Sequence, residues 1–205
     1  MIITKIEYQK NDRDRISIFI DGEFAFGVSE ELLLKFALKK GQEVEPEQVK
    51  AWMAEKEYFE AKTSALNYLS MRVHSTKELK DKLKKKGFGL DAISRVLVRL
   101  EELGLTDDKR FAEVLLRDKL RKPIGKRRLQ QELYKKGIKR DMASEVMEAT
   151  DLNADALCQT AAERKLRSLQ KEPDKQKAKR KLIDFLMRRG FEWEVIRPVV
   201  EKLFN

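Results

Sequence analysis

Apolar and polar residues alternate along the first 28 residues of the chain. The alternation runs through residues 2–8, 16–20 and 24–28, mostly with isoleucine or an aromatic residue at every second position. Asp21-Gly22, between the last two segments, is a dipeptide typical of two-residue hairpin turns. Because side chains of a strand point alternately to opposite faces, this pattern predicts a small three-stranded antiparallel β meander.

From Pro46 onward the spacing of apolar residues changes to that of helices. Proline suits the first turn of a helix, where its missing N–H group would have no partner in any case. Apolar residues then recur every three or four positions to the end of the chain. Trp52 and Trp193 both lie at apolar positions of this pattern, so we expect them to pack in cores rather than to stack on nucleic-acid bases.

Three glycines lie in matching surroundings about 50 residues apart. They are Gly87, Gly137 and Gly190. Each has leucine four and eight residues before it, an apolar residue directly after it and valine nine residues after it. The leucines form the buried stripe of a helix, and the glycine allows the left-handed conformation that ends the helix. A second helix follows each glycine, and a third precedes each pair.

The pattern therefore predicts a mainly α protein of three tandem three-helix repeats with a small N-terminal antiparallel β meander. The predicted domains are an N-terminal meander and helix at 1–57 and repeats at 58–104, 105–152 and 153–205. Such repeats cannot bury their apolar stripes alone and must stack on their neighbours. We therefore expect an elongated, curved array.

The uneven distribution of charge along the chain indicates a class of binding partner. Charged residues make up 39% of the chain and the net charge is +10. Residues 1–60 hold 9 basic and 13 acidic side chains, whereas residues 61–205 hold 36 and 22. A positive field of this size favours DNA, RNA or a filament that contains DNA. The alternative interpretation is that lysine-rich helix faces serve only solubility.

The residues that carry enzyme chemistry are scarce. Cys158 is the one cysteine and His74 the one histidine, which excludes an internal disulfide and a cysteine-based zinc site. Asp107 and Asp108 precede a helix and are expected to cap it. No Walker-type glycine loop is present. We therefore expect no enzyme, cofactor or metal. Because no signal peptide or long apolar run occurs, we expect a cytoplasmic protein without a membrane anchor. We also expect a monomer.

Four segments resemble, in order, the signatures of the RecX family, which regulates the RecA recombinase. They are Arg72–Leu79 followed by Leu83 and Gly87, then Leu105–Ala112, Gly125–Ile138 and Leu182–Phe191. The resemblance covers roughly residues 58–203, so the N-terminal extension lies outside the minimal family core. Each motif alone consists mostly of residues that many helices and helix ends share. All four motifs in order, over three repeats, are specific to the family.

The resemblance implies tandem three-helix repeats and a regulator of DNA repair, homologous recombination and the SOS response. RecX-like proteins bind the RecA filament on single-stranded DNA and restrain its ATP hydrolysis, strand exchange and co-protease functions. No catalytic residue is implied. One alternative function is a general DNA- or RNA-binding protein that acts without RecA, and another is a helical scaffold.

The candidate binding surface consists of basic residues at recurring positions around the three glycines. The positions ten, two and one residues before each glycine are basic in every repeat. Stacking of the repeats could align them into one basic stripe, although basic residues at a helix C-terminus also complement the helix dipole. The densest group flanks Pro123-Ile124-Gly125. The candidate partner- and DNA-binding residues are Lys77, Lys80, Lys84, Arg121, Lys122, Lys126, Arg127, Arg128, Lys135, Lys136, Arg180, Lys181, Arg188 and Arg189.

Overall fold

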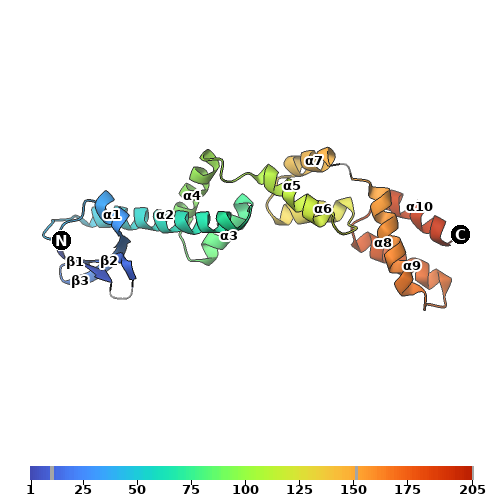
Figure 1. Cartoon of the computed structure of the whole chain (residues 1–205), viewed down its shortest axis with the longest axis horizontal. Helices are drawn as coiled ribbons and strands as arrows, with labels where there is room; N and C mark the ends of the chain where they lie inside the picture. The colour runs from blue at the N-terminus through green and yellow to red at the C-terminus, as the bar shows by residue number, and fades with distance from the viewer. Residues whose placement is uncertain (10–11, 151, 205) are drawn as a thin grey trace. The chain divides into compact units, whose positions relative to one another are not determined.

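The fold, given by a computed structural model that describes residues 1–9, 12–150 and 152–204, is mainly helical with an N-terminal sheet (Figure 1). The predicted fold class, a meander followed by three-helix repeats, is confirmed. The elements are β1 (Ile3–Gln9), β2 (Asp12–Ile20), β3 (Glu23–Ser29), α1 (Glu30–Lys35), α2 (Pro46–Met71), α3 (Thr76–Lys85), α4 (Leu90–Glu102), α5 (Asp108–Lys119), α6 (Lys126–Lys135), α7 (Arg140–Ala149), α8 (Ala154–Leu169), α9 (Lys175–Arg188) and α10 (Trp193–Phe204).

The chain forms two compact units, each with its own interior. The first unit holds Met1–Arg72 and Leu79–Leu103, and the second holds Val73–Glu78 and Gly104–Asn205. Helix α3 therefore begins in the second unit and continues in the first. This division matters for function because the second unit contains two complete three-helix repeats and the contact between them.

The N-terminal strands form an antiparallel sheet in the order β1-β2-β3. Asp21 and Gly22 both have positive φ, 50° and 88°, as a tight hairpin turn requires. The predicted alternation is correct for β2 but wrong at the start of β1. Ile3 is fully buried and Ile2 is 43% exposed, because the pairing of β1 with β2 shifts register between Ile3 and Lys5.

Helix α2 is continuous over 26 residues and contributes to two cores. Pro46 occupies its first turn, as the sequence predicts, and Glu45 forms a capping box with Gln48. Its first half packs against the sheet, where the Trp52 ring stacks on Phe36 with centroids 6.0 Å apart. The expected core position of Trp52 is confirmed, although the ring is only partly buried.

The leucines that define the repeats fill the interiors of the three-helix units. Leucines eight and four residues before each glycine are almost completely buried, and the three glycines have φ of 93°, 85° and 85°. Helices α8, α9 and α10 of the last repeat each pack against the other two (Figure 1). A left-handed C-terminal residue is costly for any side chain other than glycine, so these positions explain why glycine recurs.

Trp193 is the exception among the predicted core residues. It is the first residue of α10 and 49% of it is exposed, so the prediction that it packs in a core is wrong. Its helical spacing is apolar, but the helices packed against α10 leave half of the Trp193 surface uncovered. Only the packing of the repeat decides which apolar positions of a helix are covered.

Candidate partner-binding surface

Two contacts within the second unit join the start of one middle helix to the end of the next one along the chain. Ser75 caps α3, because its Oγ accepts a hydrogen bond from the Glu78 N–H at 3.1 Å. The same hydroxyl donates to the carbonyl oxygen of Lys136 at 2.7 Å, in the loop that ends α6. The start of one middle helix therefore rests on the end of the next.

Gly125 occupies the position of Ser75 in the following repeat. Its N–H donates to the carbonyl oxygen of Arg189 at 3.0 Å, and the Arg127 N–H donates to that of Gly190 at 3.1 Å. A Cβ on Gly125 would lie only 2.1 Å from the carbonyl carbon of Gly190. Glycine is therefore required at residue 125 because two backbones meet there.

This arrangement places the basic end of one middle helix beside the basic start of the preceding one. The Lys77 ammonium donates to the carbonyl oxygen of Lys135 at 3.0 Å, and Lys136 forms an ion pair with Glu78. Asp108 also lies at this contact, where its carboxylate accepts from the Thr76 N–H at 2.8 Å and so caps α3. The expectation that Asp108 caps the helix it begins is therefore wrong.

Asp107 caps α5 as predicted, since its carboxylate accepts from the Arg110 N–H at 2.9 Å. Both aspartates are thus held at helix N-termini, where a negative charge is favourable. Within the described ranges no group of three or more His, Cys, Asp or Glu side chains could hold a metal ion.

The contact between α6 and α9 forms a pocket rich in cations, which we call the basic pocket. Its volume is about 630 Å³. The pocket is lined by six basic side chains, two carboxylates and one isoleucine. These are Lys119, Arg121, Lys122, Arg128, Arg188, Arg189, Asp118, Glu132 and Ile124. The excess of positive charge makes this concave surface suited to an anionic group.

The two carboxylates neutralise only part of the basic pocket. Lys119 donates to Glu132 at 3.1 Å and lowers the pKa of that carboxyl, which Arg128 also approaches to 3.3 Å. Asp118 lies 3.7 Å from Arg121. A charged Glu132 therefore orders Lys119 and Arg128 but leaves the pocket with a net positive charge.

The other cations of the basic pocket are less constrained. Arg189 donates to the carbonyl oxygen of Pro123 at 3.3 Å and lies over the Phe185 ring. For Lys122 and Arg188, no side-chain hydrogen bond or ion pair is found within residues 1–9, 12–150 and 152–204. Both are exposed, so their charges are available to a bound anion.

The structure brings some of the predicted basic residues together and separates others. Arg121, Lys122, Arg128, Arg188 and Arg189 share the basic pocket. The candidate list did not include the four other lining residues, Asp118, Lys119, Ile124 and Glu132. Lys119 and Glu132 lie one helical turn from predicted residues, and that spacing could have indicated them.

The remaining predicted residues lie elsewhere. Lys77, Lys135 and Lys136 meet at the Ser75 contact. Lys80 and Lys84 lie on the part of α3 that belongs to the first unit. Lys181 is paired with Glu172. Arg127 and Arg180 are exposed, and Lys126 lines a neighbouring pocket. The single continuous stripe expected from the sequence stays a prediction.

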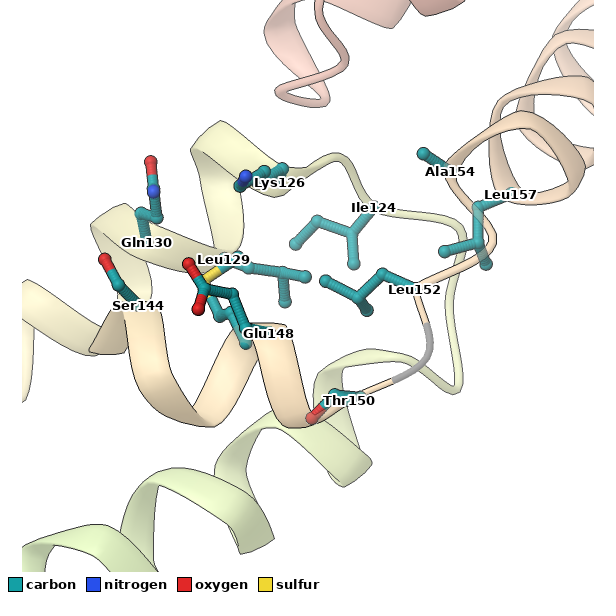
Figure 2. A pocket seen from close by; sticks show the side chains of 11 residues that line it. Ile124, Lys126, Leu129, Gln130, Ser144, Glu148, Thr150, Leu152, Ala154 and Leu157 are labelled. Atoms are coloured by element: carbon teal, nitrogen blue, oxygen red, sulfur yellow. The ribbon is translucent and has the colours of Figure 1, made fainter. Parts of the chain in front are cut away.

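That neighbouring pocket has an apolar floor, and we call it the apolar pocket. Its volume is about 360 Å³. Figure 2 shows Ile124, Leu129 and Leu152 converging between α6, α7 and the segment that leads to α8. Ile124 lines both the apolar and the basic pocket, so the two are adjacent on either side of the turn before α6.

Cys158 belongs to the core of the last repeat and to no surface site. Burial, with a smaller contribution from Asp155, raises the pKa of its thiol to about 11. Since the thiolate is the reactive form, about one thiol in a thousand would be ionised at pH 8. We expect a disulfide reagent such as DTNB to label the native chain about a hundredfold more slowly than the chain in guanidinium. Equal rates would show that Cys158 is accessible.

No helix within the described residues is long and apolar enough to cross a membrane.

His74 is buried, at 2% exposure, directly before the cap residue Ser75. It lies in the segment between α2 and α3.

Comparison with known proteins gives matches along the whole chain. Family models match four segments: the regulatory protein RecX N-terminal domain at residues 1–45, and the first, second and third three-helix domains of RecX at 61–100, 107–147 and 153–200. The N-terminal extension, which the sequence motifs leave outside the family core, thus has a family match of its own.

Individual relatives agree with the family models. The regulatory protein RecX of Clostridioides difficile is 36% identical over 100% of this chain and 96% of its own, and that of Clostridium acetobutylicum is 33% identical over 99% and 96%. A crystal structure of a regulatory protein RecX matches with a TM-score of 0.73 at 26% identity over 98% of both chains. The crystal structure of RecX from Lactobacillus salivarius matches 72% of this chain and 96% of its own, with a TM-score of 0.62 at 27% identity.

Proposed function

Because this chain belongs to the RecX family of regulatory proteins, we propose that it binds the RecA nucleoprotein filament and inhibits its recombinase, ATPase and co-protease activities. The observation that carries the proposal is the match to RecX relatives along the whole chain, including all three repeats. In this proposal residues 1–57 form the N-terminal extension and the repeats span 58–104, 105–152 and 153–205. The chain acts as a monomer without a cofactor.

The charge of the repeats supports a target that contains DNA. The predicted basic residues are exposed apart from Lys136, which is half-buried. Cations at such positions can approach phosphates and release the counterions around DNA, so this part of the binding free energy should fall steeply with salt. The basic pocket adds a concave surface whose arginines can form forked hydrogen bonds with phosphate or carboxylate groups.

The test is a titration of this chain into RecA bound to single-stranded DNA, with ATP hydrolysis as the readout. We expect strong inhibition at well below one chain per RecA subunit, because a chain that binds the filament can affect many subunits, whereas competition for DNA needs comparable amounts of protein. Inhibition should persist when excess free DNA is added.

Two outcomes would contradict the proposal. Inhibition that appears only near one chain per RecA subunit and disappears with excess DNA would indicate a general nucleic-acid-binding protein. Unchanged ATP hydrolysis by a chain that still binds DNA would indicate the same, and the family relationship would then describe the fold alone.

A further inference from the structure

We propose that the junction of the basic and apolar pockets binds an acidic segment of a partner protein that inserts one apolar side chain beside Ile124. The inference rests on the proposed function, since it assigns this surface to the protein component of the filament rather than to its DNA. The remaining exposed basic residues are left for DNA.

The residues that line the apolar pocket suit the binding of one aliphatic or aromatic side chain of the partner. Its floor is made by Ile124, Leu129, Leu152 and Leu157, which Figure 2 labels, together with Met147. Polar and charged side chains surround this floor, namely Lys126, Gln130, Ser144, Glu148 and Thr150. Leu129 and Met147 are buried core residues of the second repeat, so the floor is a fixed part of the fold. A preformed apolar concavity with a polar rim is typical of a binding site.

The basic pocket determines the charge of the segment beside that anchor. It begins on the other side of Ile124 and holds six basic side chains against Asp118 and Glu132. Lys122 and Arg188 have no side-chain ion partner within the described ranges, so a carboxylate on the ligand can pair with them without breaking an existing ion pair. Charge complementarity therefore favours a ligand whose acidic residues flank its apolar anchor.

The lining residues favour a protein segment over a nucleic acid. Proteins that bind single strands place aromatic side chains under the bases, and among the described residues no aromatic side chain lines either pocket. An aliphatic floor offers a base little stacking surface, but it matches a leucine, isoleucine, methionine or phenylalanine side chain. Arginines recognise carboxylates as well as phosphates, so the basic pocket alone fits both a protein segment and a nucleic acid. The aliphatic floor of the apolar pocket favours the protein segment.

Filling the apolar pocket tests the inference without changing charge. Ala154 lines this pocket at the start of α8, and Ala156, two residues later, is exposed and lies outside it. We expect Ala154→Phe to weaken binding to the RecA filament by ~tenfold or more, the loss typical of one anchor residue. Ala156→Phe, the matched control, should bind as the natural chain does. Both variants should bind a free oligo(dT) strand unchanged.

The outcomes separate the two proposals. If the natural chain binds the filament and Ala154→Phe binds it equally well, the inference is wrong and the proposed function stands. If Ala154→Phe weakens binding to the filament and to oligo(dT) alike, the occupant is nucleic acid and the inference is again wrong.

If the natural chain does not bind the filament, the proposed function is wrong. A direct probe still tests the present inference in that case. The probe is a short synthetic peptide with one leucine between Asp and Glu residues, compared with the same peptide carrying serine in place of leucine. In NMR spectra of the full chain, we expect the leucine peptide to shift the amide signals of Ile124, Gly125 and Ala154 and the serine peptide to shift them far less. Equal shifts with both peptides, or none with the leucine peptide, would overturn the inference.

Discussion

Gly125→Ala should lower the free energy of unfolding of the second unit by about 3 kcal/mol. The added methyl group would lie 2.1 Å from the Gly190 carbonyl carbon and 2.2 Å from the Phe191 nitrogen, which are backbone atoms that cannot turn away. Separation of the two backbones would weaken the hydrogen bonds from Gly125 to Arg189 and from Arg127 to Gly190. Hydrogen exchange of the α6 and α9 amides measures the loss in that unit.

Gly89→Ala is the matched control for this variant. Gly89 is also an N-cap glycine with negative φ, at the start of α4, but the atoms nearest to a Cβ there belong to the Glu57 carboxylate, at 3.2 Å. A flexible side chain can move by a few tenths of an ångström, so the control should cost about 1 kcal/mol or less, mostly through the change of cap residue. Equal losses from both substitutions would mean that the backbone contact at Gly125 contributes little to stability.

The double charge reversal Lys122→Glu with Arg188→Glu should weaken binding to the RecA filament by on the order of ten- to a hundredfold at low salt. It adds two negative charges to a pocket that loses two positive ones, so an anionic ligand is repelled. The effect should shrink as salt is raised, because screening shortens the range of exposed charges to about 10 Å at 0.1 M. Equilibrium binding at two salt concentrations measures both changes.

The fold should survive this reversal, because both side chains are exposed and neither has an ion partner within the described ranges. Lys39→Glu with Lys40→Glu serves as the control, since it changes the net charge of the chain equally at exposed positions of the first unit. Similar losses in both variants would show that overall charge, and not the basic pocket, determines affinity. No loss from the Lys122 and Arg188 reversal in a folded chain would remove the basic pocket from the binding surface.

Much of the architecture could be predicted from the sequence because its signals are local. A glycine with leucines four and eight residues before it specifies one helix and its end, whatever lies around it. Asp107 and Pro46 act within one helical turn of their own position, and both begin helices as predicted. Repetition of the pattern then indicates the three-helix units, because each copy must bury the same stripe.

Errors occurred where a local pattern left two outcomes open. The alternation at the start of the chain fits Ile2 or Ile3 as the buried residue, and a register shift in the sheet chose Ile3. Trp193 has apolar helical spacing, but no neighbouring helix covers it fully. Asp108 is close enough in sequence to cap α5, yet its carboxylate caps α3 instead.

The sequence by itself determined the meander, the middle helices with the glycines that end them, and the surplus of positive charge in the repeats. Only the tertiary structure decided which of those charges meet. Ser75 reaches a carbonyl 61 residues away, and Gly125 lies against the backbone of Gly190. These contacts depend on how one repeat stacks on the next, which no spacing within a helix specifies. The basic pocket and the apolar pocket beside Ile124 exist because of that stacking.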